Sequence, residues 1–363
     1  MKNSLLFGLL LSSVFSFAQE FTMDLAQDLK PRNIGPAGMS GRVTAIDVVT
    51  EDPDIIYAGT ASGGLWKSTS GGTKWTPIFD NESTASIGAV AIDPSNASVV
   101  WVGTGEGNPR NSLNGGYGVF RSLDAGKTWT SMGLEKTRHI HRILIDPSDS
   151  NTVYVGAIGS PWGAHKERGV YKTTDGGKTW KQVLFTNTLS GVGDMVMDPK
   201  NPNKLLVGMW EHKRDPWFFK SGGQGSGLYL TYDGGETWKK LSDKEGLPEG
   251  ELGRIGLAIA PSNTDVIYAL VEAKKNALYR SLDGGEKWEK MNDKEEIGNR
   301  PFYYSDLAVD PSNENRIYSV FTYVNVSEDG EKALKNSCLL ITYPMVFTQT
   351  ITLGIFTQKI QIS

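Results

Sequence analysis

Short apolar runs separated by turn-forming residues recur along most of the chain. One unit contains apolar runs at Gly88–Ile92, Val99–Gly103 and Tyr117–Arg121, with a fourth run from Thr128, and its first run ends in the turn signal Asp93-Pro-Ser-Asn96. The next unit repeats this order at Arg142–Ile145, Val153–Gly156, Gly169–Lys172 and Thr179–Val183. Short runs bounded by Gly, Pro, Asn and Asp predict β-strands, so we expect four antiparallel strands in each unit.

Each unit also carries one eight-residue motif between its third and fourth predicted strands. The motif starts at positions 68, 122, 173, 231, 281 and 327, so its copies lie 46 to 58 residues apart, the length of a propeller blade. The five complete copies are Ser68–Trp75, Ser122–Trp129, Thr173–Trp180, Thr231–Trp238 and Ser281–Trp288. A sixth copy begins at Ser327-Glu-Asp-Gly330 and then stops matching. The first copy has Ser70 where the others have Asp, so we expect a weaker turn there.

The motif has the chemistry of a hairpin turn. Its aspartate can accept hydrogen bonds from backbone N–H groups two or more residues further along, and its glycines supply positive φ. Its tryptophan begins the returning strand and can fill the space between neighbouring sheets. We therefore assign structural roles to Asp124, Trp129, Asp175, Trp180, Asp233, Trp238, Asp283 and Trp288.

The constant four-strand unit predicts an all-β fold, a β-propeller of four-stranded blades. Five complete blades and a broken sixth can be drawn, so we expect a chain truncated from a larger propeller. A β-sandwich and a β-helix are the alternative folds, but neither accounts well for the four-strand period.

The octet Ser-x-Asp-x-Gly-x-Thr-Trp resembles the Asp-box, or BNR, repeat, one of the WD40/YVTN-like propeller repeats. The segment from residue 42 to 330 is most similar to the bacterial sortilin-like (VPS10-type) or "glycosyl hydrolase BNR repeat" group. The segments Arg32-Asn-Ile-Gly-Pro36, Ser40-Gly-Arg42 and Gly103-Thr-Gly-Glu-Gly-Asn108 are typical of that group. The resemblance implies a propeller whose Asp-boxes lie away from the active face. The wider family includes sialidases, xyloglucan-cleaving hydrolases and sortilin-type receptors, so function stays open.

Strand order decides which loops share a face of such a propeller. The turns after the first and third strands lie on one face, whereas the loops after the second strand and the connections between blades lie on the other, around the central channel. Aromatic and charged side chains gather in this second set, which suits the recognition of a sugar or a peptide. We expect ligand contacts from Arg110, Trp162, His165, Trp210, His212, Arg214, Trp217 and Tyr303, although any of them could instead pack between long loops.

Glycoside hydrolysis would require two carboxylates on that face. Glu106, Glu211 and Asp215 are the catalytic candidates because of their position. The Phe/Tyr-Arg-Ile-Pro segment of sialidases is missing, so we exclude that activity. His139 and His141 alternate along the chain without a nearby third ligand, so we predict no metal site, and we expect no cofactor.

Composition removes further classes of function. The net charge is −4 and Lys and Arg are scattered, so we expect no nucleic-acid partner. The single cysteine, Cys338, excludes an intrachain disulfide.

The N-terminus predicts export. Lys2 precedes the apolar stretch Leu5–Phe17, and the small residues Ser16 and Ala18 favour signal cleavage before Gln19. We expect no membrane span after cleavage, and a mature chain that is secreted, periplasmic or at the cell surface.

The tail from residue 331 to 363 departs from the repeat. It has no Trp and no Asp-Pro turn, and it contains the only cysteine. Codons for residues 330 to 339 can, when read one base earlier, complete the sixth motif, so we expect a frameshift. Unpaired sheet edges would then favour aggregation or degradation. The alternative is a genuine hydrophobic strand that closes the ring.

These features divide the chain into a signal peptide (1–18), a lead-in (19–41), propeller blades (42–330) and an aberrant tail (331–363). We expect an exported, non-catalytic propeller that binds a peptide, protein or glycan through its loop face, monomeric if intact and inactive if truncated. The alternative is a glycoside hydrolase of the Asp-box superfamily acting on a polysaccharide.

Overall fold

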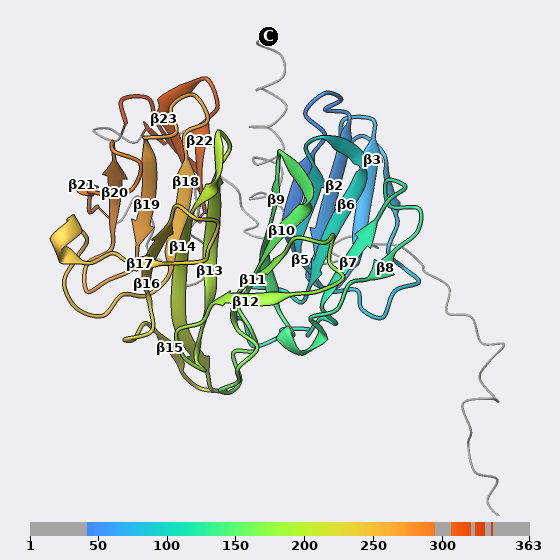
Figure 1. Cartoon of the computed structure of the whole chain (residues 1–363), viewed down its shortest axis with the longest axis horizontal. Helices are drawn as coiled ribbons and strands as arrows, with labels where there is room; N and C mark the ends of the chain where they lie inside the picture. Colours follow the sequence, from blue (N-terminus) through green and yellow to red (C-terminus); the bar gives the residue numbers. More distant parts are fainter. Residues whose placement is uncertain (1–41, 295–305, 321–323, 331–334, 337–363) are drawn as a thin grey trace, which may run out of the picture. The chain divides into compact units, whose positions relative to one another are not determined.

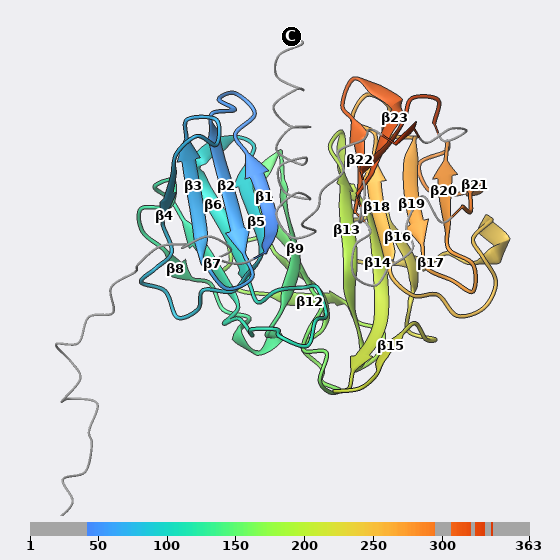
Figure 2. The ribbon, with the colours of Figure 1, turned by 180° about the vertical axis from the view of Figure 1, so that it is seen from behind.

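Four-stranded antiparallel sheets follow one another along the chain, in the order that the repeat predicts. The computed structural model describes residues 42–294, 306–320, 324–330 and 335–336. These residues form six sheets that succeed one another around a central channel (Figures 1 and 2). The fold is a six-bladed β-propeller.

Blades 1 to 3 each pair their strands in chain order. Their strands are β1 (Val43–Val48), β2 (Ile55–Thr60), β3 (Leu65–Thr69) and β4 (Trp75–Pro77); β5 (Ile87–Asp93), β6 (Asn96–Thr104), β7 (Val119–Ser122) and β8 (Thr130–Ser131); and β9 (Ile140–Asp146), β10 (Asp149–Ala157), β11 (Gly169–Thr173) and β12 (Lys181–Leu184). A short 3-10 helix, η3 (Glu135–Thr137), links blades 2 and 3.

Blades 4 to 6 follow the same plan, and blade 4 has one additional strand. Their strands are β13 (Ser190–Asp198), β14 (Asn201–Arg214), β15 (Phe219–Ser221), β16 (Gly227–Thr231) and β17 (Lys239–Lys240); β18 (Ile255–Ile259), β19 (Ile267–Val271), β20 (Ala277–Ser281) and β21 (Glu289–Asn292); and β22 (Asp306–Asp310), β23 (Asn313–Val320), β24 (Val324–Ser327) and β25 (Lys335–Asn336). A second 3-10 helix, η4 (Asp243–Glu245), links blades 4 and 5.

The sixth unit has a full set of four strands. Its last strand, β25, pairs with β24 through Asn325 opposite Asn336 and Val326 opposite Lys335. The expected break in the sixth blade is therefore not confirmed. The predicted signal peptide, the lead-in up to residue 41 and the rest of the tail lie outside the described residues, so their assignments stay predictions.

Turn chemistry sets where the strands end. In blade 2, the Asp93 carboxylate accepts hydrogen bonds from the backbone N–H (2.8 Å) and the hydroxyl (2.7 Å) of Ser95. This Asx turn lets β5 and β6 pair as far as Asp93 opposite Asn96, beyond the predicted runs.

The Asp-box turns have the hydrogen bonds that their sequence predicts. Asp124 accepts from the backbone N–H (2.8 Å) and hydroxyl (2.7 Å) of Thr128 and from the Ser122 hydroxyl (2.8 Å). These bonds, with Thr128 first, lower the pKa of Asp124 to about 2. Gly126 adopts a φ of 88°, and its N–H donates to Ser122 Oγ. In the first copy, Ser70 Oγ accepts the N–H of Lys74 at 2.9 Å and lies 3.4 Å from the hydroxyl oxygen of Ser68, a looser contact than those of the aspartates.

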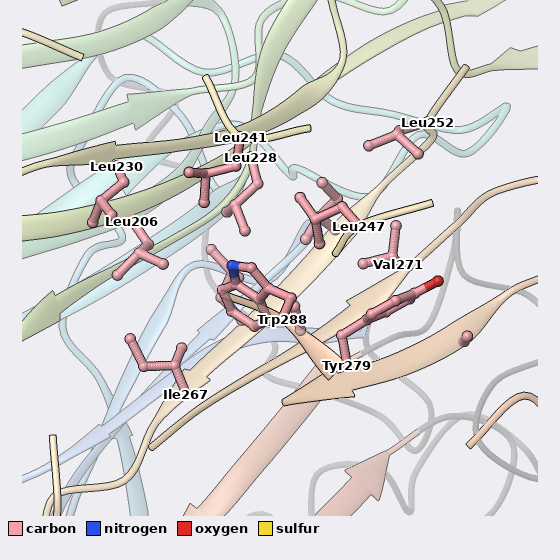
Figure 3. Close-up of a cluster of buried hydrophobic side chains, with 14 residues drawn as sticks. Leu206, Leu228, Leu230, Leu241, Leu247, Leu252, Ile267, Val271, Tyr279 and Trp288 are labelled. Atoms are coloured by element: carbon pink, nitrogen blue, oxygen red, sulfur yellow. The ribbon is translucent and has the colours of Figure 1, made fainter. Parts of the chain in front are cut away.

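The Asp-box tryptophans lie between blades. The indole N–H of Trp129 donates to the carbonyl of Ile78 in the preceding blade, and Trp180 bonds Met132 in the same way. Figure 3 shows the largest of these layers, where Trp288 packs with leucines from β14 and β16. The tryptophans therefore join the blades as well as closing the turns.

Candidate functional site

The loop face comprises the loops after each second strand, principally residues 105–118, 158–168 and 209–226, together with the connections between blades. The turns at the ends of the first and third strands lie on the opposite, Asp-box face. Because the chain meanders through each blade, this division follows from strand order alone.

The longest of these loops is a β-hairpin. Strand β14 continues beyond its blade to Arg214, and β15 returns beside it, with His212 opposite Ser221 and Arg214 opposite Phe219. Figure 1 shows this hairpin at the lower edge of the molecule. Trp217 at its tip is 87% exposed, so its indole is available to a ligand.

The base of the hairpin is packed. The Trp210 ring is 1% exposed and stacks on His212, with 4.5 Å between ring centroids. Its indole N–H donates to Ser221 Oγ at 3.0 Å. Burial lowers the pKa of His212 to about 3, so this imidazole is neutral. Both side chains support the hairpin from within, and their contact with a ligand stays a prediction.

Arg214 ties three loops together. Its backbone N–H donates to the carbonyl of Pro161 at 2.8 Å, and its guanidinium donates to the carbonyl of Pro109. The same guanidinium lies 4.4 Å above the ring of Phe219. One residue of blade 4 thus fixes loops of blades 2 and 3.

The loop of blade 3 is organised by a buried arginine. Arg168 donates to the carbonyls of Ile158 and Leu189, both at 3.0 Å, and to those of Ser160 and Gly163. Burial lowers the pKa of Arg168 to about 10, within the range where it stays charged. Four carbonyls around one guanidinium hold the loop in a fixed shape.

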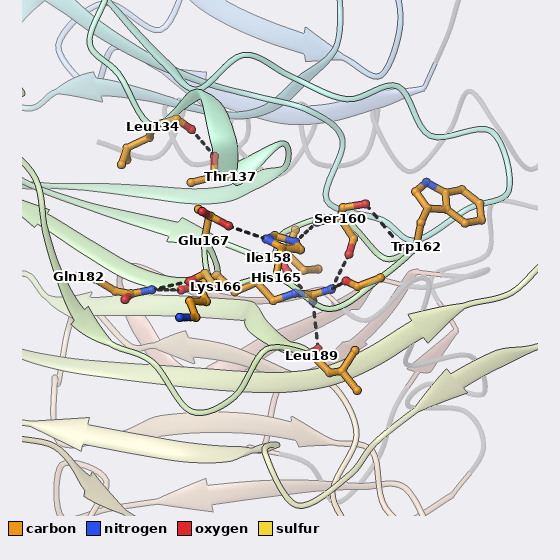
Figure 4. A network of polar contacts seen from close by, with 12 residues as sticks. Leu134, Thr137, Ile158, Ser160, Trp162, His165, Lys166, Glu167, Gln182 and Leu189 are labelled. Carbon is orange, nitrogen blue, oxygen red and sulfur yellow. Dashed lines mark hydrogen bonds and ion pairs between the residues drawn. The ribbon is translucent and has the colours of Figure 1, made fainter.

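This loop presents the second exposed tryptophan. Figure 4 shows Ser160, Trp162 and His165 together on it. His165 Nε2 accepts the backbone N–H of Ser160 at 2.8 Å, and Trp162 is 44% exposed. Among the described residues, Trp162 and Trp217 are the tryptophans with exposed rings, and both belong to the loop face.

Two of the three predicted carboxylates are buried and paired. Glu106 accepts from Arg42 Nε at 2.9 Å, and His139 Nδ1 lies 2.9 Å from its carbonyl. Glu211 accepts from Lys220 Nζ, Asn187 and the N–H of Gly225, each at 3.0 Å.

The hydrogen bonds around Glu211 favour the ionised form of its carboxyl group. Burial alone would raise the pKa of Glu211, but the hydrogen bonds from Asn187, Lys220 and Gly225 bring it below its ordinary value. Such a carboxylate suits an anionic role or a structural one, and it does not suit a proton donor.

Asp215 is more accessible. Its side chain is 34% exposed and lies 3.0 Å from Lys213 Nζ at the hairpin tip. Two further accessible carboxylates were missed: Glu167, beside His165 on the blade 3 loop, and Asp306 at the start of β22. Glu167 could have been found from its place after a second strand, and Asp306 from its position in the repeat.

The remaining residues that the sequence singled out add little to the description of the site. Arg110 is partly buried in the blade 2 loop, and Tyr303 lies outside the described residues. His139 and His141 are both buried. In the described part of the chain, no group of three His, Cys, Asp or Glu side chains could hold a metal ion.

The repeat, the Asp-box bonds and the succession of sheets define the class of this protein, an Asp-box or BNR-type β-propeller. The family model described as "Sortilin, neurotensin receptor 3" (Sortilin-Vps10) matches residues 117–247. Within the described residues, no helix is long and apolar enough to cross a membrane.

Its sequence relatives include enzymes that act on polysaccharide. A xyloglucanase of Paenibacillus sp is 26% identical over 289 residues, covering 70% of this chain and 26% of the relative. A xyloglucanase of Hypocrea jecorina is 28% identical over 187 residues, covering 47% and 21%. The chain therefore spans about a quarter of the length of the curated relatives it matches.

Solved structures support the fold. An ancestral GH74 enzyme superposes with a TM-score of 0.57 at 20% identity, over 82% of this chain and 38% of that one. The GH74 xyloglucanase from Xanthomonas campestris gives 0.52 at 18% identity, over 81% and 52%. YCF48 bound to a D1 peptide gives 0.53 at 14% identity, over 84% and 88%. At these identities the likeness concerns the fold alone.

The relatives overturn one expectation from the sequence. We expected a non-catalytic propeller that binds a peptide, protein or glycan, but the curated relatives are xyloglucanases. The sequence offers Glu106, Glu211 and Asp215 as catalytic candidates by their position alone, because Asp-box turns specify the scaffold and carry no information about the loops. The alternative, a glycoside hydrolase, fits better.

Proposed function

We propose that this protein is a glycoside hydrolase that acts on a polysaccharide related to xyloglucan. The observation that carries the proposal is the 26% identity to the Paenibacillus xyloglucanase over 289 residues, which covers 70% of the chain. A match of that extent includes most of the propeller, loops as well as turns.

The exposed aromatic rings of the loop face support a glycan as the substrate. Trp162 and Trp217 project from neighbouring loops, and Arg214 joins those loops through its bond to Pro161. Exposed aromatic rings pack well against the apolar faces of sugar rings. Two such rings on loops held together offer two apolar contacts to a polysaccharide.

Hydrolysis needs two carboxyl groups on either side of the scissile bond. Asp215 and Glu167 are accessible and lie on the same two loops as the exposed tryptophans. We therefore assign them as the first pair to test. Glu106 and Glu211 are the alternative pair, and their ion pairs with Arg42 and Lys220 would have to open for them to act.

The test is an assay of the full chain on xyloglucan, with release of reducing ends measured alongside retention in a xyloglucan-containing native gel. We expect hydrolysis by the wild type and a fall of orders of magnitude in Asp215→Asn or Glu167→Gln, with retention in the gel preserved. Asp52→Asn is the matched control, because Asp52 is an exposed aspartate in the turn between β1 and β2 on the Asp-box face.

Two outcomes would contradict parts of the proposal. Unchanged hydrolysis in both variants would exclude Asp215 and Glu167 as the catalytic pair. Glu106→Gln and Glu211→Gln would then test the alternative pair. Absence of hydrolysis by the wild type on xyloglucan and on unsubstituted β-glucan would overturn the enzymatic function altogether.

The predicted export fits this activity. A polysaccharide does not cross a membrane, so an enzyme that cleaves it must be outside the cytoplasm. We propose that residues 1–18 are a cleaved signal, which N-terminal sequencing of the mature protein would test by the presence of Gln19 at its start.

A further inference from the structure

A cavity of about 290 Å³ opens in the wall of the central channel, and neither Trp162 nor Trp217 of the loops is among the residues that line it. It is formed by the inner strands of blades 1 to 3 and by the first residue of β22. Its lining residues are Val43, Thr44, Ala45, Ile46, Gly88, Ala89, Val90, His141, Arg142, Ile143 and Asp306. Most of this wall is aliphatic, and its charged groups are Arg142 and Asp306.

The repeat brings these charged groups to one level of the channel. Arg142, Asp194 and Asp306 each lie four residues before the aspartate of the Asp-Pro turn in their own blade. Arg142 Nε donates to Asp194 at 2.7 Å, and its NH2 group lies 3.5 Å from Asp306. Asp194 is also held by the backbone N–H of Leu257, so its carboxylate is committed to the scaffold.

Asp306 is held more loosely. It accepts from Arg254 at 3.2 Å and from Arg142 at 3.5 Å, and its side chain is 56% exposed. Distances of this length at an exposed carboxylate leave room for a ligand hydroxyl to bond to it.

Among the charged residues that the structure describes at this site, positive and negative groups balance. Two arginines, Arg142 and Arg254, face two aspartates, Asp194 and Asp306, and burial keeps the pKa of His141 well below its ordinary value, so its ring is neutral. A charged ligand therefore gains no net attraction in this cavity. A neutral ligand rich in hydroxyl groups can accept from the guanidinium and donate to the carboxylate without disturbing the balance.

We propose that this cavity binds one neutral monosaccharide unit, with Arg142 donating to a ring hydroxyl and Asp306 accepting from another. The aliphatic side chains of Val90 and Ile143 offer contact to the C–H groups of the ring. The proposal deepens the glycan specificity proposed above and rests on it for the choice of sugars. It adds a site in the channel, separate from the tryptophans of the loops.

The experiment is saturation-transfer NMR on the full chain with D-xylose, D-glucose, D-galactose and D-glucuronate, each titrated to high millimolar concentration. We expect at least one neutral sugar to bind saturably and glucuronate to bind more weakly. Asp306→Asn should weaken binding of the neutral sugar by roughly tenfold or more, because a charge-assisted hydrogen bond is lost. Asp52→Asn is again the matched control, and a thermal melt verifies that each variant is folded.

The result separates this site from the proposed function. Trp217→Ala should leave monosaccharide binding in the channel unchanged while weakening retention by the polymer. Absence of saturable binding of any neutral sugar by the wild type would overturn the channel site, even if xyloglucan is hydrolysed. Tighter binding of glucuronate, or wild-type affinity in Asp306→Asn, would also overturn it, whereas binding of the sugars without hydrolysis would leave the channel site standing alone.

Discussion

Thr179 donates two hydrogen bonds to the carboxylate of Asp175, from its backbone N–H at 3.0 Å and from its hydroxyl at 2.7 Å. On the other side of the turn, Thr173 donates its hydroxyl to the same carboxylate at 2.7 Å and accepts the N–H of Gly177 at 3.0 Å. The same arrangement recurs in the boxes around Asp124 and Asp233. The buried hydroxyl before the aspartate is thus as much a part of the turn as the aspartate itself.

Replacing that hydroxyl should destabilise the fold. Thr173→Val keeps the shape of the side chain but leaves the buried N–H of Gly177 without its acceptor, so we expect a loss of about 1–3 kcal/mol in the free energy of unfolding. Urea denaturation measures it. Thr174→Val, at the exposed neighbouring position, is the control and should be close to wild type. Equal midpoints for the two variants would contradict the structural role of the hydroxyl.

The stability of the propeller should depend on pH through Asp47. This carboxylate accepts the backbone N–H of Ile92 in the next blade at 2.7 Å and that of Val48 at 2.9 Å. Burial raises the pKa of Asp47 to about 6, because the two backbone hydrogen bonds offset only part of the cost of desolvating its charge.

Because the folded-state pKa of Asp47 lies above the unfolded value near 4, the folded protein binds a proton that the unfolded chain releases. The contribution of this group to stability therefore falls as pH rises from about 4 to about 6, by on the order of 2–3 kcal/mol. Urea denaturation of the wild type and Asp47→Asn at pH 4.5 and pH 7 tests this, since the amide does not titrate. A difference in stability between the two proteins that is the same at both pH values would contradict it.

Acidification should loosen the loop that carries Trp162. His165 Nε2 can accept the N–H of Ser160 only while the ring is neutral. Burial, followed by the charge of Arg168, lowers the pKa of His165, so the neutral form is favoured in the folded state. The stabilisation is complete above the ordinary histidine pKa near 6.5 and is lost as pH falls below it.

Amide hydrogen exchange at Ser160 measures this loosening directly. Corrected for the intrinsic pH dependence of exchange, its protection should fall between pH 7 and pH 5 in the wild type. In His165→Gln the side-chain carbonyl can accept the same bond at either pH, so protection should change little. Equal pH dependence in both proteins would show that the imidazole does not hold the loop.

The two tryptophans of the hairpin should respond differently to truncation. Trp217→Ala removes an exposed ring, so we expect a loss of about 1–2 kcal/mol in xyloglucan binding with an unchanged melting temperature. Trp210→Ala removes a buried ring stacked on His212 and should cost about 3–5 kcal/mol of stability. Affinity electrophoresis and thermal melts distinguish the two effects. Unaltered binding in Trp217→Ala would remove the hairpin tip from the glycan site.

Much of the fold was predictable because the turns are local. The hydrogen bonds to the aspartate and to the preceding hydroxyl of an Asp-box come from within eight consecutive residues, and the glycine φ values belong to the same short segment. The strands between the turns follow from apolar runs of four or five residues. The sequence also predicted which loops share a face, since meander order alone decides this, while the binding role of those loops stays a prediction.

The burial and pairing of individual side chains on those loops were not predictable from the sequence. Glu106, Trp210 and Asp215 look equally available in the sequence, yet the first two are buried and only Asp215 is partly exposed. Burial here results from contacts between distant segments: Arg42 reaches Glu106 across 64 residues, and Arg214 reaches Pro109 across 105.

The sequence by itself determined the repeat, the chemistry of the turns and the division of the loops between two faces, because each depends on neighbours along the chain. Only the tertiary structure decided which carboxylates reach solvent, that Arg214 joins three loops, and that Arg142 meets Asp306 across 164 residues in the channel. Closing blades around an axis brings together side chains whose separation in the sequence carries no signal, and the desolvation and pairing that follow depend on that closure.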